Sequence, residues 1–163
     1  IHHSASPGEE QGEQVDAALI DRWHARRGFG LQTARGQVHI GYHYVILADG
    51  TVEQGRPEWM KGAHARGHND RIGICLVGNF SSSGNPGRRM KPDKPTKAQL
   101  DALHDLLCKL CRKYHLRPQD VVRHRDLAKT ACPGDRFPYD AVIRRLGQSL
   151  GTMDEVRRAR AAR

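Results

Sequence analysis

Apolar residues recur at spacings of three and four in three segments of the chain, the spacing of amphipathic helices. The pattern predicts helices over residues 13–27, 97–115 and 138–150. The second helix is preceded by a capping box, in which Thr96 is the N-cap and Gln99 stands three residues later. The apolar positions expected to face the core are Val15, Leu19 and Trp23 in the first helix, and Leu100, Leu103, Leu107, Leu110 and Tyr114 in the second.

Extended segments lie between these helices. Residues 37–47 are rich in β-branched and aromatic residues and predict a strand, which the turn "ADG" joins to residues 51–56 as a β-hairpin. The continuous apolar run over 72–80 predicts a strand buried on both faces. The first residues and residues 120–124 are also expected to be short strands, and 81–95 a surface loop. This mixture predicts an α/β fold with a central mixed β-sheet flanked by helices.

The 163 residues suit a single domain, expected over residues 1–150, followed by a basic C-terminal tail over 151–163. The sequence lacks a run of about 20 apolar residues, the length that spans a membrane, and its first residues lack the apolar region of a signal peptide. The net charge of +9 favours anionic partners such as nucleic acid, cell-wall polymers or acidic lipid surfaces, or serves solubility alone. The net charge alone does not indicate which of these partners, if any, the protein binds.

The sequence contains four cysteines, and three of them have a structural interpretation. Cys75 lies in the apolar run "IGICLVG" and is expected to be a buried thiol. Cys108 and Cys111 form a C-x-x-C that falls in the middle of a helical pattern with no second such pair, so we expect core packing and not a redox or metal motif. No disulfide framework is expected, which fits a reducing compartment.

Ten histidines divide into two groups. Five are expected to be surface or satisfied core residues: His24, His39, His68, His104 and His115. The other five lie at strand ends or in glycine-containing segments, where active sites tend to form: His2, His3, His43, His64 and His124.

One candidate for chemistry is the stretch "VVRHRDLAKTACPGD", which places His124 and Cys132 near each other in sequence. Together with a histidine of the first strand they could supply the three protein ligands of a catalytic zinc site. The spacing between them is not a standard metal pattern, so spacing alone leaves this open.

Several further segments occur in one order with this stretch, and the sequence resembles the zinc-dependent N-acetylmuramoyl-L-alanine amidases of the phage endolysin type (type 2 amidases), which share their fold with the peptidoglycan recognition proteins. The resemblance covers residues 1–146. Its matching segments are "IHHSAS", "IDRWHARRGF", "IGYHYVILADGTVEQGR", "GAHARGHNDRIGICLVGNF", "PTKAQLDALHDLL" and "HRDLAKTACPG".

The resemblance implies one zinc ion held by His2, His124 and Cys132. His3 is expected to be a neighbour and not a ligand, because adjacent side chains of a strand face opposite ways. A cysteine at position 132 fits an enzyme, since the non-catalytic recognition proteins commonly carry serine there.

The resemblance also implies roles around the metal. Tyr42 matches an active-site tyrosine whose hydroxyl would hydrogen-bond either the zinc-bound water or the developing oxyanion. Thr130 stands where the family has a lysine or threonine that assists catalysis, and Lys129 lies one residue off. His64 matches a histidine that lines the cleft, and is expected to bind substrate, whereas His43 is expected to support the sheet behind the site.

The implied reaction is hydrolysis of the amide between N-acetylmuramic acid and L-alanine in bacterial peptidoglycan, by a phage or prophage endolysin that lyses its host. The alternatives are a peptidoglycan-binding module without activity and a bacterial wall-recycling amidase. The expected protein is a monomer in the host cytoplasm until lysis, and at the cell wall or periplasm afterwards. Its basic charge would favour anionic wall or outer-membrane polymers, and no motif predicts specific nucleic-acid binding.

Overall fold

A four-stranded mixed sheet forms the centre of the molecule. The computed structural model describes residues 1–33, 36–83 and 91–161. The strand order is β1-β8-β6-β7, in which β1 and β6 run parallel to β8 and β7 runs antiparallel to β6. The predicted mixed sheet and the hairpin that contributes to it are therefore confirmed. The bounds of the strands are β1 His2–His3, β6 Tyr44–Ile46, β7 Val52–Gln54 and β8 Ile74–Leu76.

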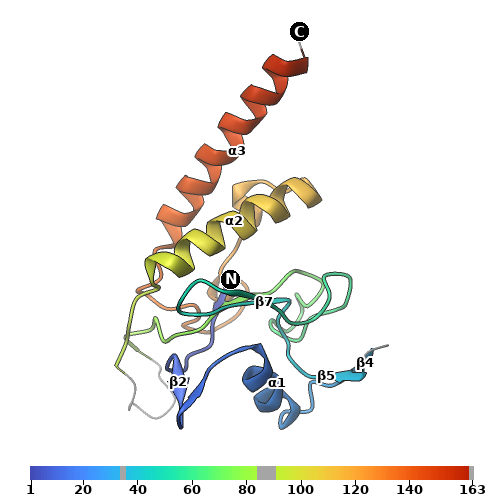
Figure 1. Ribbon diagram of the computed structural model, residues 1–163, viewed down its shortest axis with the longest axis vertical. Helices are drawn as coiled ribbons and strands as arrows, with labels where there is room; N and C mark the ends of the chain where they lie inside the picture. Colours follow the sequence, from blue (N-terminus) through green and yellow to red (C-terminus); the bar gives the residue numbers. More distant parts are fainter. Residues whose placement is uncertain (34–35, 84–90, 162–163) are drawn as a thin grey trace.

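Helices cover both faces of this sheet (Figure 1). The helix α1 (Ala17–Ala25) packs with Val45 and Val77 on one face, and α2 (Lys97–Tyr114) packs with Ile46 and Leu76 on the other. The last helix, α3 (Tyr139–Ala161), packs against α2 and then runs on past it (Figure 1). In the described part of the chain, no helix combines the length and apolar character that crossing a bilayer requires.

The strand β8 lies between β1 and β6, and all its residues are buried, as predicted for a strand covered on both faces. The capping box of α2 is also present, with the Thr96 hydroxyl accepting from the Gln99 N–H at 3.0 Å. On α2 the predicted Leu103, Leu107 and Leu110 are buried, but Tyr114 remains 41% exposed. Cys75, Cys108 and Cys111 are buried free thiols, as predicted.

Several predicted element boundaries were wrong. The strand predicted over 72–80 is observed only over Ile74–Leu76. The first helix does not begin at residue 13. Asp16 is its N-cap, because the Asp16 carboxylate accepts a hydrogen bond from the Leu19 N–H at 2.7 Å. The two preceding segments instead form a small antiparallel pair, β2 (Glu9–Glu10) with β3 (Glu13–Gln14). The predicted strand over 37–47 is split into β6 and β5 (Gly36–Val38), which pairs with β4 (Leu31–Thr33) outside the central sheet.

The strand predicted over residues 120–124 is also wrong. This segment connects two short 3₁₀ helices, η1 (Pro118–Asp120) and η2 (His124–Asp126). The Asp120 carboxylate accepts from the Arg117 backbone N–H, and the Asp126 carboxylate does the same for Arg123, both at 2.8 Å. These local bonds favour turns over strand pairing. The loop predicted over 81–95 is irregular where it is described, and residues 84–90 lie outside the described residues.

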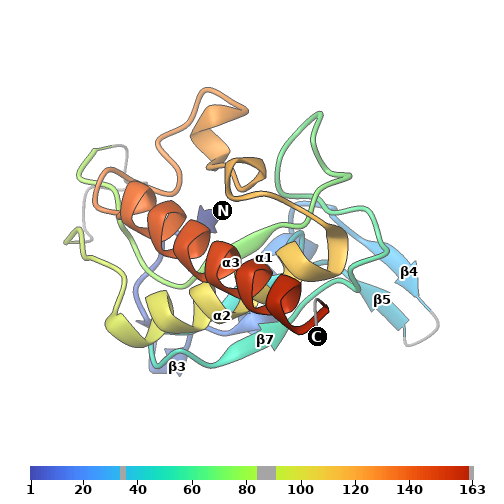
Figure 2. The same ribbon diagram turned by 90° about the horizontal axis from the view of Figure 1, so that it is seen from above.

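The connection between α2 and α3, drawn in light orange to orange, passes beside the N-terminus of the chain (Figure 2). This connection brings the residues near position 124 close to the N-terminal segment. The candidate ligands of these two segments therefore lie together at the β1 edge of the sheet.

Candidate metal centre

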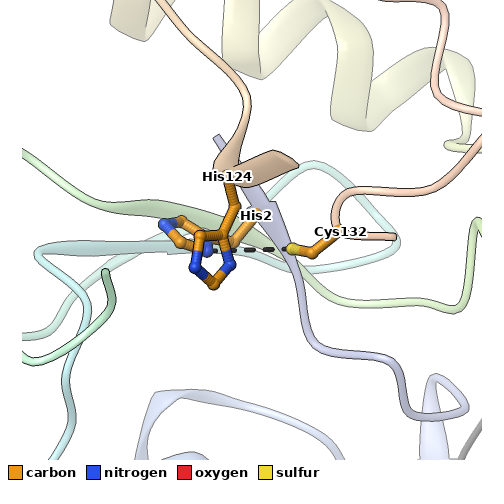
Figure 3. A group of neighbouring side chains, drawn as sticks. All are labelled: His2, His124 and Cys132. Carbon is orange, nitrogen blue, oxygen red and sulfur yellow. Dashed lines mark hydrogen bonds between the residues drawn. The ribbon is translucent and has the colours of Figure 1, made fainter. Parts of the chain in front are cut away.

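Three side chains from distant parts of the sequence converge at the edge strand. His2 comes from β1, His124 from the start of η2, and Cys132 from the loop before α3 (Figure 3). One nitrogen of each ring and the sulfur all lie within 4.8 Å of one another. The three predicted ligands are thus brought together by the fold.

Backbone contacts hold these segments in place. The His124 N–H donates to the Ile1 carbonyl at 3.1 Å, and the Arg125 N–H donates to the Cys132 carbonyl at 2.9 Å. Gly134 has a φ of +110°, and a Cβ there would lie 2.0 Å from the Phe80 carbonyl oxygen. Only glycine allows this approach, so the "CPG" sequence places the cysteine loop against the segment that follows β8.

The two adjacent histidines of β1 face opposite ways, as predicted. The His3 ring packs beside Phe80, and its Nδ1 accepts from the Phe80 N–H at 3.1 Å. The backbone N–H of His3 nevertheless reaches the site, because it points at the Cys132 sulfur from 3.4 Å. A thiolate at this position would gain a hydrogen bond from the backbone.

Burial sets the charge state of these groups. It lowers the pKa of His2 and of His124, so both imidazoles are neutral near pH 7 and have a lone pair for a cation. Burial also raises the pKa of the Cys132 thiol to about 11, so the thiolate needs a neighbouring positive charge.

This donor set fits zinc. Zn–N bonds of about 2.0 Å and Zn–S bonds of about 2.3 Å in a tetrahedron place nitrogen and sulfur about 3.5 Å apart. The distance between His2 Nδ1 and Cys132 Sγ is 3.8 Å. Two imidazoles and a thiolate leave a fourth position for water or substrate, as in catalytic sites.

Two further predicted residues contact His2. The His64 ring lies with its Nδ1 3.1 Å from His2 Nε2, and the Tyr42 ring centroid lies 5.2 Å from that of His2. Burial raises the pKa of Tyr42 well above its ordinary value, so the phenol keeps its proton and acts as a donor at neutral pH.

The remaining predicted residues lie around this group. Thr130 is exposed on the cysteine loop, and its hydroxyl accepts from the Cys132 N–H at 3.2 Å. His43 supports the sheet, as expected, because its Nδ1 accepts from the Gly73 N–H at 2.9 Å and its Nε2 donates to the Met60 carbonyl at 2.8 Å. His24 is a satisfied core residue, with its Nδ1 accepting from the Gly41 N–H at 2.8 Å.

A cleft of about 650 Å³ extends from His2 and His124 toward α2. Its walls are mostly apolar and include Leu107 and Leu110 of α2. Trp59 lies at the cleft with 81% of its surface exposed, and neighbouring Glu58 is held by side chains of α2. Neither residue was predicted from the sequence, although a tryptophan between a predicted hairpin and "GAHA" was the available signal.

Arg56, which is 2% exposed, was not predicted from the sequence either. Its guanidinium donates to the carbonyls of Ile40, Lys61 and Phe29 at 2.5–2.6 Å. Because it joins three loop segments, Arg56 orders the loop that carries Trp59 and His64.

Comparisons with known proteins agree with this geometry. Residues 1–135 match the Amidase_2 family model, described as N-acetylmuramoyl-L-alanine amidase. The chain is 36% identical to the endolysin of Enterobacteria phage T3 over 135 residues, which cover 82% of this chain and 77% of that protein.

Solved structures of amidases and peptidoglycan recognition proteins have a similar fold. The amidase LysC from Clostridium intestinale URNW superposes with a TM-score of 0.71 at 33% identity, covering 89% of this chain and 80% of that one. A Drosophila PGRP-LB mutant in complex with tracheal cytotoxin superposes with a TM-score of 0.57 at 26% identity, covering 83% of this chain and 73% of that one. The fold shared by amidases and peptidoglycan recognition proteins is thus confirmed for this chain.

Proposed function

Since this chain belongs to the N-acetylmuramoyl-L-alanine amidase family, we propose that it hydrolyses the amide between N-acetylmuramic acid and L-alanine in peptidoglycan with one zinc ion at His2, His124 and Cys132. The observation that carries the proposal is the convergence of these three donors, of which His2 and His124 line an open cleft. A zinc ion bound there supplies a Lewis acid and lowers the pKa of a coordinated water to about 7.

The chain's own groups complete the chemistry. Tyr42 keeps its phenolic proton, and its ring lies beside that of His2. Its hydroxyl is hydrogen-bonded with Cys75 in this structure, and in this proposal it donates instead to the oxyanion that develops on the scissile carbonyl once substrate is bound. The Thr130 hydroxyl accepts from a backbone N–H, and its own proton remains for substrate. Losing one such donor typically costs about 10²–10³-fold in rate.

The cleft supports a polymer fragment as substrate. Its apolar walls suit the methyl groups and aliphatic parts of a muropeptide, and the exposed Trp59 ring offers a flat face at the cleft. The amide to be cleaved would sit at the metal end, with the rest of the substrate along α2.

The test is mass spectrometry of purified sacculi after digestion. The intact protein is expected to release stem peptides with a free L-alanine amino terminus, together with unsubstituted glycan strands. Cys132→Ala and His124→Ala are expected to release neither and to contain less zinc. Products cleaved in the glycan, or full activity of both variants, would contradict the proposal.

The same experiment separates the alternative of a binding module. A recognition protein without activity has no use for an open metal position, and it would retain sacculi without releasing peptides. Binding of the parent protein to sacculi with no new amino termini would favour that alternative.

In the cell we propose an endolysin role, supported by the similarity to the T3 endolysin. The protein would then accumulate in the host cytoplasm as a monomer and act on the cell wall at lysis. A wall-recycling role for a bacterial relative is distinguished by expression: a lysis protein clears an induced culture once a membrane pore opens, and a recycling amidase does not.

A further inference from the structure

A chain of hydrogen bonds runs from the backbone through two imidazoles to the metal centre. The Nε2 atom of His64 lies 2.9 Å from the carbonyl oxygen of Arg71, and its Nδ1 lies 3.1 Å from Nε2 of His2. A carbonyl oxygen can only accept, so the proton of a neutral His64 is on Nε2. Its Nδ1 is then an acceptor, and Nε2 of His2 must donate the proton between the two rings.

This assignment leaves one ring nitrogen of His2 for a cation. With its proton on Nε2, His2 has its lone pair on Nδ1, which is the atom 3.8 Å from the Cys132 sulfur. The hydrogen bond from His2 to His64 therefore selects the tautomer that the metal centre needs.

The His64 ring is itself fixed by the backbone around it. A Cβ on Gly62 would lie 2.5 Å from Cδ2 of the ring, and a Cβ on Gly73 would lie 2.4 Å from the same atom. The side-chain oxygen of Asn69 accepts from the backbone N–H of His64 at 2.8 Å. Two glycines and a loop anchor thus form a slot for this ring.

We propose that His64 is a positioning residue for the metal centre, which fixes the tautomer and ring orientation of His2 and thereby the affinity for zinc. Both of its ring nitrogens are engaged, one by Arg71 and one by His2, so little hydrogen-bonding capacity remains for the substrate contact predicted from sequence. The proposal rests on the proposed zinc site and deepens it. Partners of this kind typically change metal affinity by about 10–100-fold.

A pair of variants tests this role. His64→Phe fills the slot but has no acceptor, and His64→Asn places an amide oxygen near the position of Nδ1. Zinc affinity, measured by competition with a chromophoric chelator, is expected to fall about 10–100-fold in His64→Phe and to recover in His64→Asn. His39→Phe is the matched control and should bind zinc as the parent does, because the His39 ring contacts Asp21 far from the metal.

Equal zinc affinity in the parent and His64→Phe, with a raised KM for sacculi, would overturn the positioning role and leave the proposed function intact. Absence of zinc binding in the parent would overturn the proposed function itself.

A second measurement needs no variant, in case His64→Phe does not fold. In ¹⁵N-labelled, zinc-loaded full-length protein, long-range ¹H–¹⁵N correlations are expected to show His2 coordinated through Nδ1 with its proton on Nε2. Coordination through Nε2 would overturn the proposal, because that atom could not then donate to His64.

Discussion

At the scale of single residues, the Glu58 carboxylate joins the loop that carries Trp59 to helix α2. It accepts hydrogen bonds from the hydroxyls of Tyr44 and Tyr114, and from Lys113 at 2.6 Å. Burial alone would raise the pKa of Glu58, but the hydrogen bonds from Lys113, Tyr114 and Tyr44 outweigh it and lower the pKa from 4.5 to about 2. The ionised form is therefore the one that stabilises the fold.

The variant Glu58→Gln, which removes the carboxylate charge, tests this stabilisation, and we expect its loss of stability to depend on pH. The folded pKa lies below the unfolded value of 4.5, so the stabilisation is complete above about 4.5 and is lost as the pH falls through about 2. We expect Glu58→Gln to lower the free energy of unfolding by about 1–2 kcal/mol at pH 7, since Lys113 is partly solvent-exposed. The difference from the parent should shrink between pH 4.5 and 2 in urea titrations. A constant difference over that range would show that the carboxylate charge contributes nothing.

The three proposed metal ligands were assigned from sequence through the family resemblance, because the motifs that carry it are local: an apolar strand residue before His2, and "HRD" and "ACPG" around the other two. The positioning role that we propose for His64 could not be predicted from sequence. Its hydrogen bond to His2 joins residues 62 positions apart and depends on two glycines that admit the ring. Sequence patterns indicate residue types near a site, but they do not give the atom that each ring presents.

At the scale of elements, the start of α2 depends on Thr96. Its hydroxyl accepts from the Gln99 N–H and donates to the Ala48 carbonyl at 2.7 Å, so it joins the helix to the turn after β6. Thr96→Ala is expected to lower the free energy of unfolding by about 1 kcal/mol, because a helix N–H loses its partner. Urea titration measures this, and Thr96→Ser, which keeps the hydroxyl, is the control. An unchanged alanine variant would mean that water replaces the cap at no cost.

Elements with strong periodicity were predicted well, and elements set by side-chain hydrogen bonds were not. The α2 helix has an apolar stripe and a cap, and its predicted bounds differ from the observed ones by one residue at its end. The strand predicted over 120–124 has β-branched residues, but the carboxylates of Asp120 and Asp126 bind backbone N–H groups and turn the chain instead. Such local competition between side chain and backbone is invisible to hydrophobic patterns.

At the scale of the whole molecule, the helix α3 extends past α2 and away from the central sheet (Figure 1). The Leu146 side chain is fully buried and Leu150 packs against the same core, and the helix then continues to Ala161 without a break. Residues 1–150 therefore contain the core contacts of the described side chains. We propose that they suffice for catalysis, and that the basic residues of 151–163 act on binding to anionic surfaces.

Deleting residues 151–163 is expected to leave zinc content and the hydrolysis rate of purified sacculi within about twofold of the parent. Lysis of intact cells with an outer membrane should fall, and adsorption to anionic wall polymers should become less sensitive to salt. The chemical step and the binding step are thus measured separately. Unchanged lysis of intact cells would mean that the tail is only solvated, and lost hydrolysis of sacculi would place it in the catalytic domain.

The most direct test of the account is X-ray absorption at the zinc edge of the purified, zinc-loaded protein. One equivalent of zinc is expected, with one sulfur at about 2.3 Å and nitrogen or oxygen ligands at about 2.0 Å, and the sulfur shell should disappear in Cys132→Ala. A shell without sulfur in the parent, or one that Cys132→Ala leaves unchanged, would contradict the assignment of His2, His124 and Cys132 as the centre.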